Sequence, residues 1–339
     1  MKEIRDNARK LMGKFCHVCP VCNGKACAGE VPGMGGLGSG SSFTGNVQAL
    51  SEIKFNMRLI HDVTEPDTAI TLLGKQLDLP VLAAPIGGVS FNMGGGVSED
   101  QYIRAIVSGC KAKSIIGCTG DGVPEFIHSA GFSAIQEAGG HGIPFIKPWE
   151  DEELYRKLEL AKETGTDILG MDIDAAGLIT LRRMGRPVSP KPLDKLAAII
   201  KKSGLKFILK GIMTPDDAER AIDAGADAIV VSNHGGRVLD HAPGTAVVLP
   251  AIAATVKGRI SVLVDGGVRS GGDVLKLLAL GANAVMIGRP FSIAAVGGLQ
   301  EGVEKYIDTL QGELQQTMVL TGTRSAAAVD RGILFDSSR

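Results

Sequence analysis

The chain has 339 residues, of which 44% are apolar and 22% are charged, so it can bury a sizeable core and is not a disordered protein. Its 36 Lys and Arg nearly cancel its 37 Asp and Glu, which argues against nucleic acid or a membrane surface as a partner, because both require a basic excess. The apolar stretches are short and broken by glycine, and residues 1–15 lack a signal-peptide core, so we expect a cytoplasmic protein without a membrane span.

The first 75 residues follow no regular repeat, and we expect them to form an N-terminal extension packed on the rest of the chain. In chain order we expect a helix, a cysteine cluster, a Gly- and Ser-rich loop, a second helix and a hairpin, at residues 1–15, 16–27, 29–44, 46–56 and 68–79. One large domain, residues 76–339, follows this extension.

From residue 76 the chain repeats a short apolar run followed by an amphipathic helical stretch. Continuous apolar runs suit strands buried on both faces, as parallel sheets require. Eight such runs occur, at residues 80–85, 114–119, 143–147, 168–172, 206–210, 228–232, 261–265 and 284–288. Eight βα units predict an α/β fold of the (β/α)₈ TIM-barrel type. The alternative, a doubly wound sheet, usually has fewer strands and an early Gly-rich phosphate loop.

In a (β/α)₈ barrel the catalytic groups lie at the carboxyl ends of the strands. Seven of the eight predicted strands end in a polar residue, namely Thr119, Lys147, Asp172, Lys210, Ser232, Asp265 and Arg289. Burying charged groups in a core is expensive, so a bound ligand explains this ring better than core packing does.

The ends of the last two strands have the pattern of a phosphate site. Asp265-Gly266-Gly267-Val268-Arg269 follows the seventh run, and Gly288-Arg289 follows the eighth. Glycines let backbone N–H groups face an anion, and barrel phosphate sites lie after strands 7 and 8. The alternative is that these glycines only form tight βα turns.

Three further residues at the strand ends are candidates for chemistry. Lys210 could form a Schiff base, neutralise an anionic intermediate or simply cap the sheet, and its spacing does not choose among these. His234 is followed by two glycines and can approach a substrate closely as a base, although a lone histidine is more often structural. Arg237 can bind a carboxylate with two parallel hydrogen bonds.

These motifs resemble the FMN-dependent α-hydroxy-acid oxidase and dehydrogenase family. The resemblance rests on Ser232–Arg237 followed by Val238-Leu239-Asp240, on Val264–Gly271 and on Ile287-Gly288-Arg289-Pro290, and it covers about residues 45–325. It implies a (β/α)₈ barrel that binds FMN and oxidises a small 2-hydroxy acid, such as lactate or glycolate, with oxygen or another electron acceptor. It also implies a homo-oligomer.

The resemblance assigns roles to single residues. His234 matches the catalytic base, and Asp174 matches the catalytic aspartate that supports it. A register two residues earlier would give that part to Asp172. Arg237 matches the arginine that binds the substrate carboxylate, and Lys210 matches the lysine at the N1/O2 edge of the flavin.

The resemblance also implies a set of flavin-binding positions. In that set a lysine, Lys147, replaces the usual glutamine, and Asp172 replaces a threonine. The expected flavin-binding residues are Pro85, Ile86, Gly87, Thr119, Lys147, Asp172, Lys210, Ser232, Asp265, Gly266, Gly267, Val268, Arg269, Gly288 and Arg289.

The substrate side departs from the family pattern. The tyrosine expected near residues 31–34 is absent, and Trp149 stands where a second tyrosine is expected. A second carboxylate-binding arginine would be one of Arg182, Arg183 and Arg186. Two rival functions therefore stay open: a redox-neutral FMN isomerase of the isopentenyl diphosphate type, and a non-catalytic flavin redox sensor.

Four cysteines form a C-x₂-C-x₂-C-x₄-C pattern, at Cys16, Cys19, Cys22 and Cys27. In an intracellular protein such a cluster indicates metal before disulfides, and four thiolates could hold zinc or an iron–sulfur cluster. Redox-active thiols, or no special role, are the alternatives. An iron–sulfur centre would favour a dehydrogenase over an oxygen-reducing oxidase, and the family resemblance gives no information on this cluster.

Overall fold

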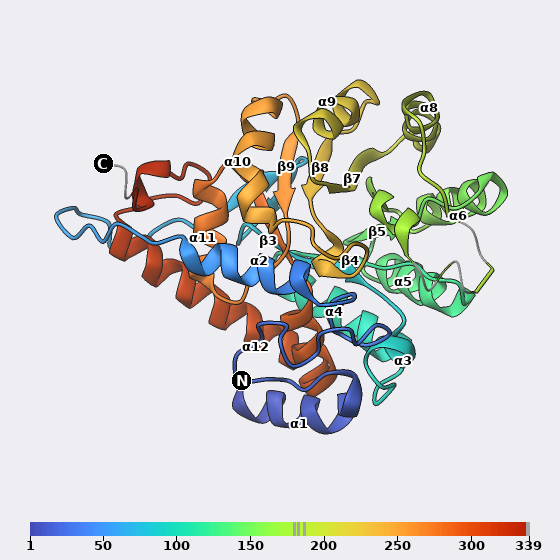
Figure 1. The fold of residues 1–339 in the computed structure, drawn as a ribbon, viewed down its shortest axis with the longest axis horizontal. Helices are drawn as coiled ribbons and strands as arrows, with labels where there is room; N and C mark the ends of the chain where they lie inside the picture. Colours follow the sequence, from blue (N-terminus) through green and yellow to red (C-terminus); the bar gives the residue numbers. More distant parts are fainter. Residues whose placement is uncertain (179–180, 182–183, 186–187, 337–339) are drawn as a thin grey trace.

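A closed barrel of eight parallel strands forms the centre of the molecule, in the order β10-β3-β4-β5-β6-β7-β8-β9 (Figure 1). The computed structural model describes the whole chain except residues 179–180, 182–183, 186–187 and 337–339. The strands are β3 (Val81–Ile86), β4 (Ile116–Thr119), β5 (Ile143–Ile146), β6 (Ile168–Asp172), β7 (Lys206–Ile212), β8 (Ala228–Val231), β9 (Ser261–Val264) and β10 (Ala284–Ile287). All eight predicted strands and the (β/α)₈ barrel are confirmed.

The strands form because their β-branched side chains are buried on both faces. All four residues of β4, β5, β8 and β10 are buried, as expected for a sheet covered by helices outside and filled by side chains inside. The register also places two residues of opposite charge side by side, because Asp172 at the end of β6 pairs with Lys210 of β7.

Helices surround the barrel: α4 (Glu99–Ala112), α5 (Glu125–Glu137), α6 (Asp151–Glu163), α8 (Leu193–Ser203), α9 (Pro215–Asp223), α10 (Thr245–Val256), α11 (Gly271–Ala279) and α12 (Arg289–Thr321). Short helices are α3 (Val89–Asn92), η2 (Ile173–Gly177), η3 (His234–Gly236) and η4 (Arg331–Ile333). Side chains cap two of these helices: Thr214 accepts a hydrogen bond from the backbone N–H of Asp217, and Ser270 accepts one from that of Asp273. No helix among the described residues is long and apolar enough to cross a membrane.

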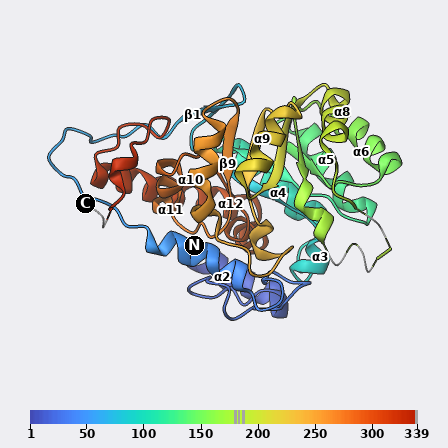
Figure 2. The ribbon, with the colours of Figure 1, turned by 45° about the horizontal axis from the view of Figure 1, so that its top comes forward.

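The N-terminal segment contains α1 (Lys2–Met12), η1 (Gly13–Phe15), α2 (Ser41–Glu52) and the antiparallel hairpin of β1 (Ile70–Leu72) and β2 (Lys75–Leu77). Figures 1 and 2 show α1 and α2, in blue, on one side of the barrel, and Figure 2 shows β1 on the opposite side. Helix α1 packs against α12, where Asn7 donates to the carbonyl oxygen of Gly297 at 2.7 Å.

The position predicted for the second helix is wrong at both ends. The sequence predicts it over residues 46–56, but α2 begins at Ser41 and ends at Glu52. Gly40 has a φ of 72°, a left-handed conformation that ends the preceding loop and lets the helix start directly after it. The predicted Gly- and Ser-rich loop is correspondingly shorter.

Candidate active site

A cavity of about 300 Å³ opens at the carboxyl ends of the barrel strands. All residues predicted for flavin binding, substrate binding or catalysis line it, except Thr119, Asp174 and Ser232. Ser232 is buried and accepts the backbone N–H of His234 at 3.0 Å, so it contacts the site through its neighbour. Thr119 lies against α5, since a methyl group on Gly131 would come within 2.8 Å of its side chain. A flavin contact by Thr119 therefore stays a prediction.

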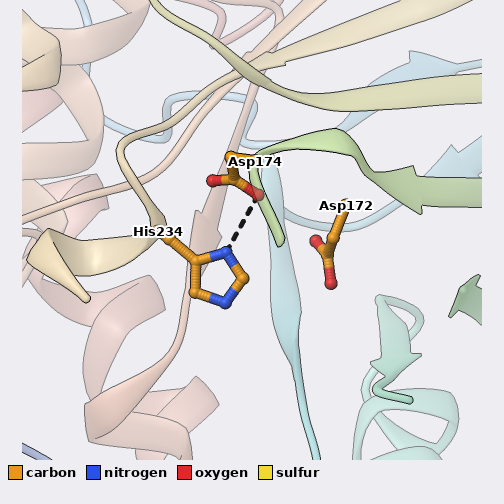
Figure 3. Close-up of side chains that lie close together, drawn as sticks. All are labelled: Asp172, Asp174 and His234. Atoms are coloured by element: carbon orange, nitrogen blue, oxygen red, sulfur yellow. Dashed lines mark hydrogen bonds and ion pairs between the residues drawn. The ribbon is translucent and has the colours of Figure 1, made fainter. Parts of the chain in front are cut away.

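His234 and Asp174 form a hydrogen-bonded pair at the mouth of the cavity (Figure 3). His234 starts η3, three residues after the last residue of β8, Asp174 lies in η2 directly after β6, and Nδ1 is 3.0 Å from Oδ1. His234 has a φ of 56°, a left-handed conformation that is uncommon for a residue with a side chain. Of the two aspartates that the alternative registers offer, the structure brings Asp174 to the histidine.

The electrostatics of the pair fix the direction of proton transfer. Burial by itself would raise the pKa of Asp174, but the charges of His234 and Lys210 hold this pKa below its ordinary value. The carboxylate is therefore ionised and can accept the proton on Nδ1. When the imidazole is neutral and carries that proton, Nε2 of His234 has a lone pair. Such an imidazole can take a proton from a substrate.

Below the histidine, Lys210 is surrounded by buried carboxylates. Its Nζ lies 3.1 Å from Oδ1 of Asp172 and 3.8 Å from Oδ2 of Asp265. Burial alone would lower the pKa of Lys210, but Asp172, Asp174 and Asp265 raise it, so the ammonium is charged. Ligand atoms of Asp172, Asp174 and His234 lie within 4.8 Å of one another, a grouping that could hold a cation. Lys210 already supplies positive charge there.

Three arginines at the cavity have no anionic partner. Arg237 donates to Oδ1 of Asn92 at 2.9 Å, Arg289 to the carbonyl oxygen of Met34 at 2.7 Å, and Arg269 to that of Cys22 at 3.0 Å. Among the residues that the structure describes, none of the three arginines forms an ion pair with a carboxylate. These uncharged oxygens accept hydrogen bonds from the guanidinium groups but do not neutralise their positive charge. The cavity can therefore bind anions.

The pKa values of these arginines agree with that interpretation. Burial lowers the pKa of Arg237 to about 10. Burial, together with the charges of Arg237 and Arg269, lowers the pKa of Arg289 to about 9. Bringing an anion into the cavity would relieve both effects.

The polar groups of the cavity fit FMN. Arg269 and Arg289 supply positive charge for a phosphate dianion, next to the Gly266–Gly267 turn. Oδ1 of Asp265 is buried and has no hydrogen-bond partner in the described part of the chain, so it can accept from a ribityl hydroxyl group. Lys210 supplies a cation for the flavin ring. The two charged replacements, Lys147 and Asp172, also line the cavity.

Apolar side chains also line the cavity, in the segments where the family pattern expects tyrosines. Val31, Pro32 and Met34 stand there with Phe91 and Leu181. Trp149 does not contribute, in contrast to its expected position.

Trp149 is instead buried against an acid beneath the cavity wall. Its exposed fraction is 1%, and its indole N–H donates to Oδ2 of Asp121 at 2.5 Å. Asp121 also accepts from the buried ammonium of Lys157 at 2.6 Å. Arg182, Arg183 and Arg186 lie outside the described residues.

Several residues of the site have no signal in the sequence. Asn92 contacts Arg237, and Asp121 lines the cavity. Asn46 of α2 and Asn233 after β8 bind each other through both amide groups, at 2.8 and 3.1 Å. Asn92 and Asp121 belong to no local pattern. Asn233 lies inside the Ser232–Arg237 motif, but nothing near it in the sequence indicates that Asn46 is its partner.

Comparison with known proteins agrees with the geometry. The sequence profile of the FMN-dependent dehydrogenases matches residues 33–192 and 182–336. The chain is 31% identical over 338 residues to a 4-hydroxymandelate oxidase from Amycolatopsis orientalis, covering 88% of this chain and 90% of the relative. It is 32% identical over 328 residues to glycolate oxidase from Spinacia oleracea, covering 84% and 85%.

A solved structure, that of mandelate oxidase with benzoyl-formic acid, superposes with a TM-score of 0.79 at 30% identity, over 98% of this chain and 97% of the other. With the barrel, the anion-binding arginines and the matched profile in agreement, the chain belongs to the FMN-dependent α-hydroxy-acid oxidase and dehydrogenase family and is an FMN-dependent oxidoreductase.

Proposed function

We propose that the protein oxidises a small 2-hydroxy acid to its 2-oxo acid, and that it prefers lactate to glycolate. The observation that carries this proposal is the opening of His234 and the unneutralised Arg237 into one cavity. The preference for lactate is supported by the apolar side chains that line the cavity, which favour a methyl group over a hydrogen atom. Oxygen or another electron acceptor would then receive the electrons.

In the proposed mechanism each residue has one task. Arg237 binds the substrate carboxylate and orients the α-carbon. Nε2 of His234 takes the hydroxyl proton, and Asp174 holds the imidazole and stabilises its protonated form. When bound, FMN supplies a two-electron acceptor at its N5 atom. Lys210 provides a fixed positive charge in the same cavity, where it can stabilise negative charge on a neighbouring group.

The first rival, an isomerase acting on a diphosphate, needs a second anion site of higher charge than a carboxylate. Arg237 and the base His234 line the same cavity, and this combination favours a carboxylic acid instead. We also propose that residues 1–75 act as an extension of the barrel domain, since α1 packs on α12 and Asn46 binds Asn233.

Anaerobic addition of substrate tests the proposed function. L-lactate should remove the visible absorption band of the protein-bound oxidised flavin, and glycolate should do so more slowly. Mandelate serves as the third acid, because its phenyl group probes the size of the apolar wall. A flavin that stays oxidised with all three acids would refute the proposal. Conversion of isopentenyl diphosphate by the reduced protein would then support the isomerase.

Asp174→Asn should slow reduction of the flavin by the substrate. The amide keeps the shape of the side chain but removes the negative charge that stabilises protonated imidazole. A hydrogen bond to a charged group contributes about 1.5–3 kcal/mol, so we expect a loss of about 10–100-fold in rate. Stopped-flow reduction rates provide the measurement. Equal rates in the Asp174→Asn variant and in the wild type would mean that the charge of Asp174 does not support His234.

A further inference from the structure

The cysteine cluster lies in a segment of the extension that the proposed function leaves unused. Residues 16–40 contain no helix or strand, and they connect η1 to α2. Cys16, Cys19, Cys22 and Cys27 are free thiols and are only partly buried. The first three have the two-residue spacing of a bacterial ferredoxin run. The barrel thiol Cys110, by contrast, is fully buried inside α4.

The backbone folds the cysteine segment back on itself. Gly24 turns the chain with a φ of 84°. The carbonyl oxygen of Phe15, the residue before Cys16, accepts the backbone N–H of Met34 at 2.9 Å, and the carbonyl oxygen of Cys27 accepts that of Glu30 at 3.3 Å. Both ends of the cysteine segment therefore lie against residues 30–34.

Two arginines of α1 and one from the turn between β9 and α11 contact this segment. Arg5 donates to the carbonyl oxygen of Cys19, and Arg9 donates to that of Val18 at 2.8 Å. Arg269 donates to the carbonyl oxygen of Cys22 and lies 3.4 Å from its sulfur. The acid of the segment, Glu30, is paired with His17 at 3.1 Å. The positive charges of the three arginines can offset the negative charge of metal-bound thiolates.

We propose that Cys16, Cys19, Cys22 and Cys27 bind a [4Fe–4S] cluster. A single zinc ion holds its sulfur ligands at about 2.3 Å, hence about 3.8 Å from one another. In the part of the chain that the structure describes, no three of these sulfurs lie within 4.8 Å of one another. A cubane cluster takes one thiolate at each iron and accepts the wider arrangement. N–H donors such as that of Arg269 then stabilise its sulfurs.

The cluster would also fix one wall of the active site. The same segment contributes Val31, Pro32 and Met34 to the cavity, and Arg289 donates to the carbonyl oxygens of Met34 and Gly35. Four bonds to iron would add to the backbone hydrogen bonds and the arginine contacts that hold this stretch, such as that from Leu37 to the carbonyl oxygen of Gly236 at 2.8 Å.

The test is the metal content of the full-length protein purified without air. We expect about four irons and four acid-labile sulfides per chain, and an electron paramagnetic resonance signal after reduction by dithionite. Replacing all four cysteines by serine should remove both, while Cys110→Ala, which removes a barrel thiol, should retain them. FMN content is measured in the same samples, so failure of the cluster is distinguished from failure of flavin binding.

Two results would overturn the proposal. One is protein that holds FMN but stays free of iron even after anaerobic incubation with ferrous iron and sulfide. The other is one zinc per chain that is lost in the four-serine variant, which would assign a single-ion site. The metal content of the wild-type chain decides between iron and zinc even if the four-serine variant fails to fold.

Discussion

Replacing His234 by alanine is expected to slow anaerobic reduction of the flavin by lactate by about 10²–10⁴-fold, the usual contribution of a positioned base. Oδ1 of Asp174 lies 3.0 Å from Nδ1 of His234 and orients the imidazole. Nε2 of His234 is then the atom that acts as the base. Alanine removes that base and leaves the arginines of the phosphate end untouched. FMN should therefore stay bound.

His241→Ala is the matched control for this prediction. His241 follows the same strand, but its side chain is 78% exposed and does not line the cavity. Its replacement should leave the reduction rate within about twofold, the change expected of a surface side chain. Equal rates in the His234→Ala variant and in the wild type, measured by stopped flow, would remove His234 from the role of base.

Replacing Lys210 by methionine is expected to lower the free energy of unfolding by about 3–5 kcal/mol, because it breaks a buried ion pair from one side only. Lys210 lies 3.1 Å from Asp172 and 3.8 Å from Asp265, and all three side chains are nearly inaccessible to solvent. Methionine fills a similar volume but leaves the acids without their cation. We also expect weaker FMN binding, since the ring loses a fixed charge.

Urea unfolding and the FMN content of the purified protein measure this effect. Lys206→Met is a control on the same strand, where the ammonium donates to the carbonyl oxygen of Leu73 at the other end of the barrel. Adding Asp172→Asn to Lys210→Met should restore part of the lost stability, because one buried charge disappears. A Lys210→Met variant as stable as the wild type would show that Asp172 and Asp265 are neutral.

The sequence predicts the barrel well because one physical signal repeats in it. Each β-branched run is buried on both faces, and a capped helix follows it, so local pattern and tertiary position agree. The ends of the predicted strands then identify many of the residues that line the cavity, including His234, Arg237 and Lys210. The resemblance adds roles to these positions, which geometry alone does not supply.

What the sequence leaves open depends on contacts between distant segments. Asp172 and Asp174 are equivalent candidates until the η2 turn directs one to Lys210 and the other to His234. Trp149 is expected near the substrate, yet its indole N–H is drawn to Asp121, whose role no neighbouring residue indicates. Local patterns do not encode such pairings, because the two partners are far apart in the chain and the neighbours of one do not indicate the other.

Barrel closure has a consequence for how the chain reaches this state. The first strand of the barrel, β3, pairs with the last, β10, through Val81 and Val285. Until β10 is synthesised, the backbone N–H and C=O groups along one edge of β3 have no partner, and the side chains of β3 are all apolar. The entropy cost of closing the long chain segment between the two strands must also be overcome. Folding should therefore be slow and complete only after β10 has left the ribosome, so a chain truncated before residue 284 should aggregate rather than fold.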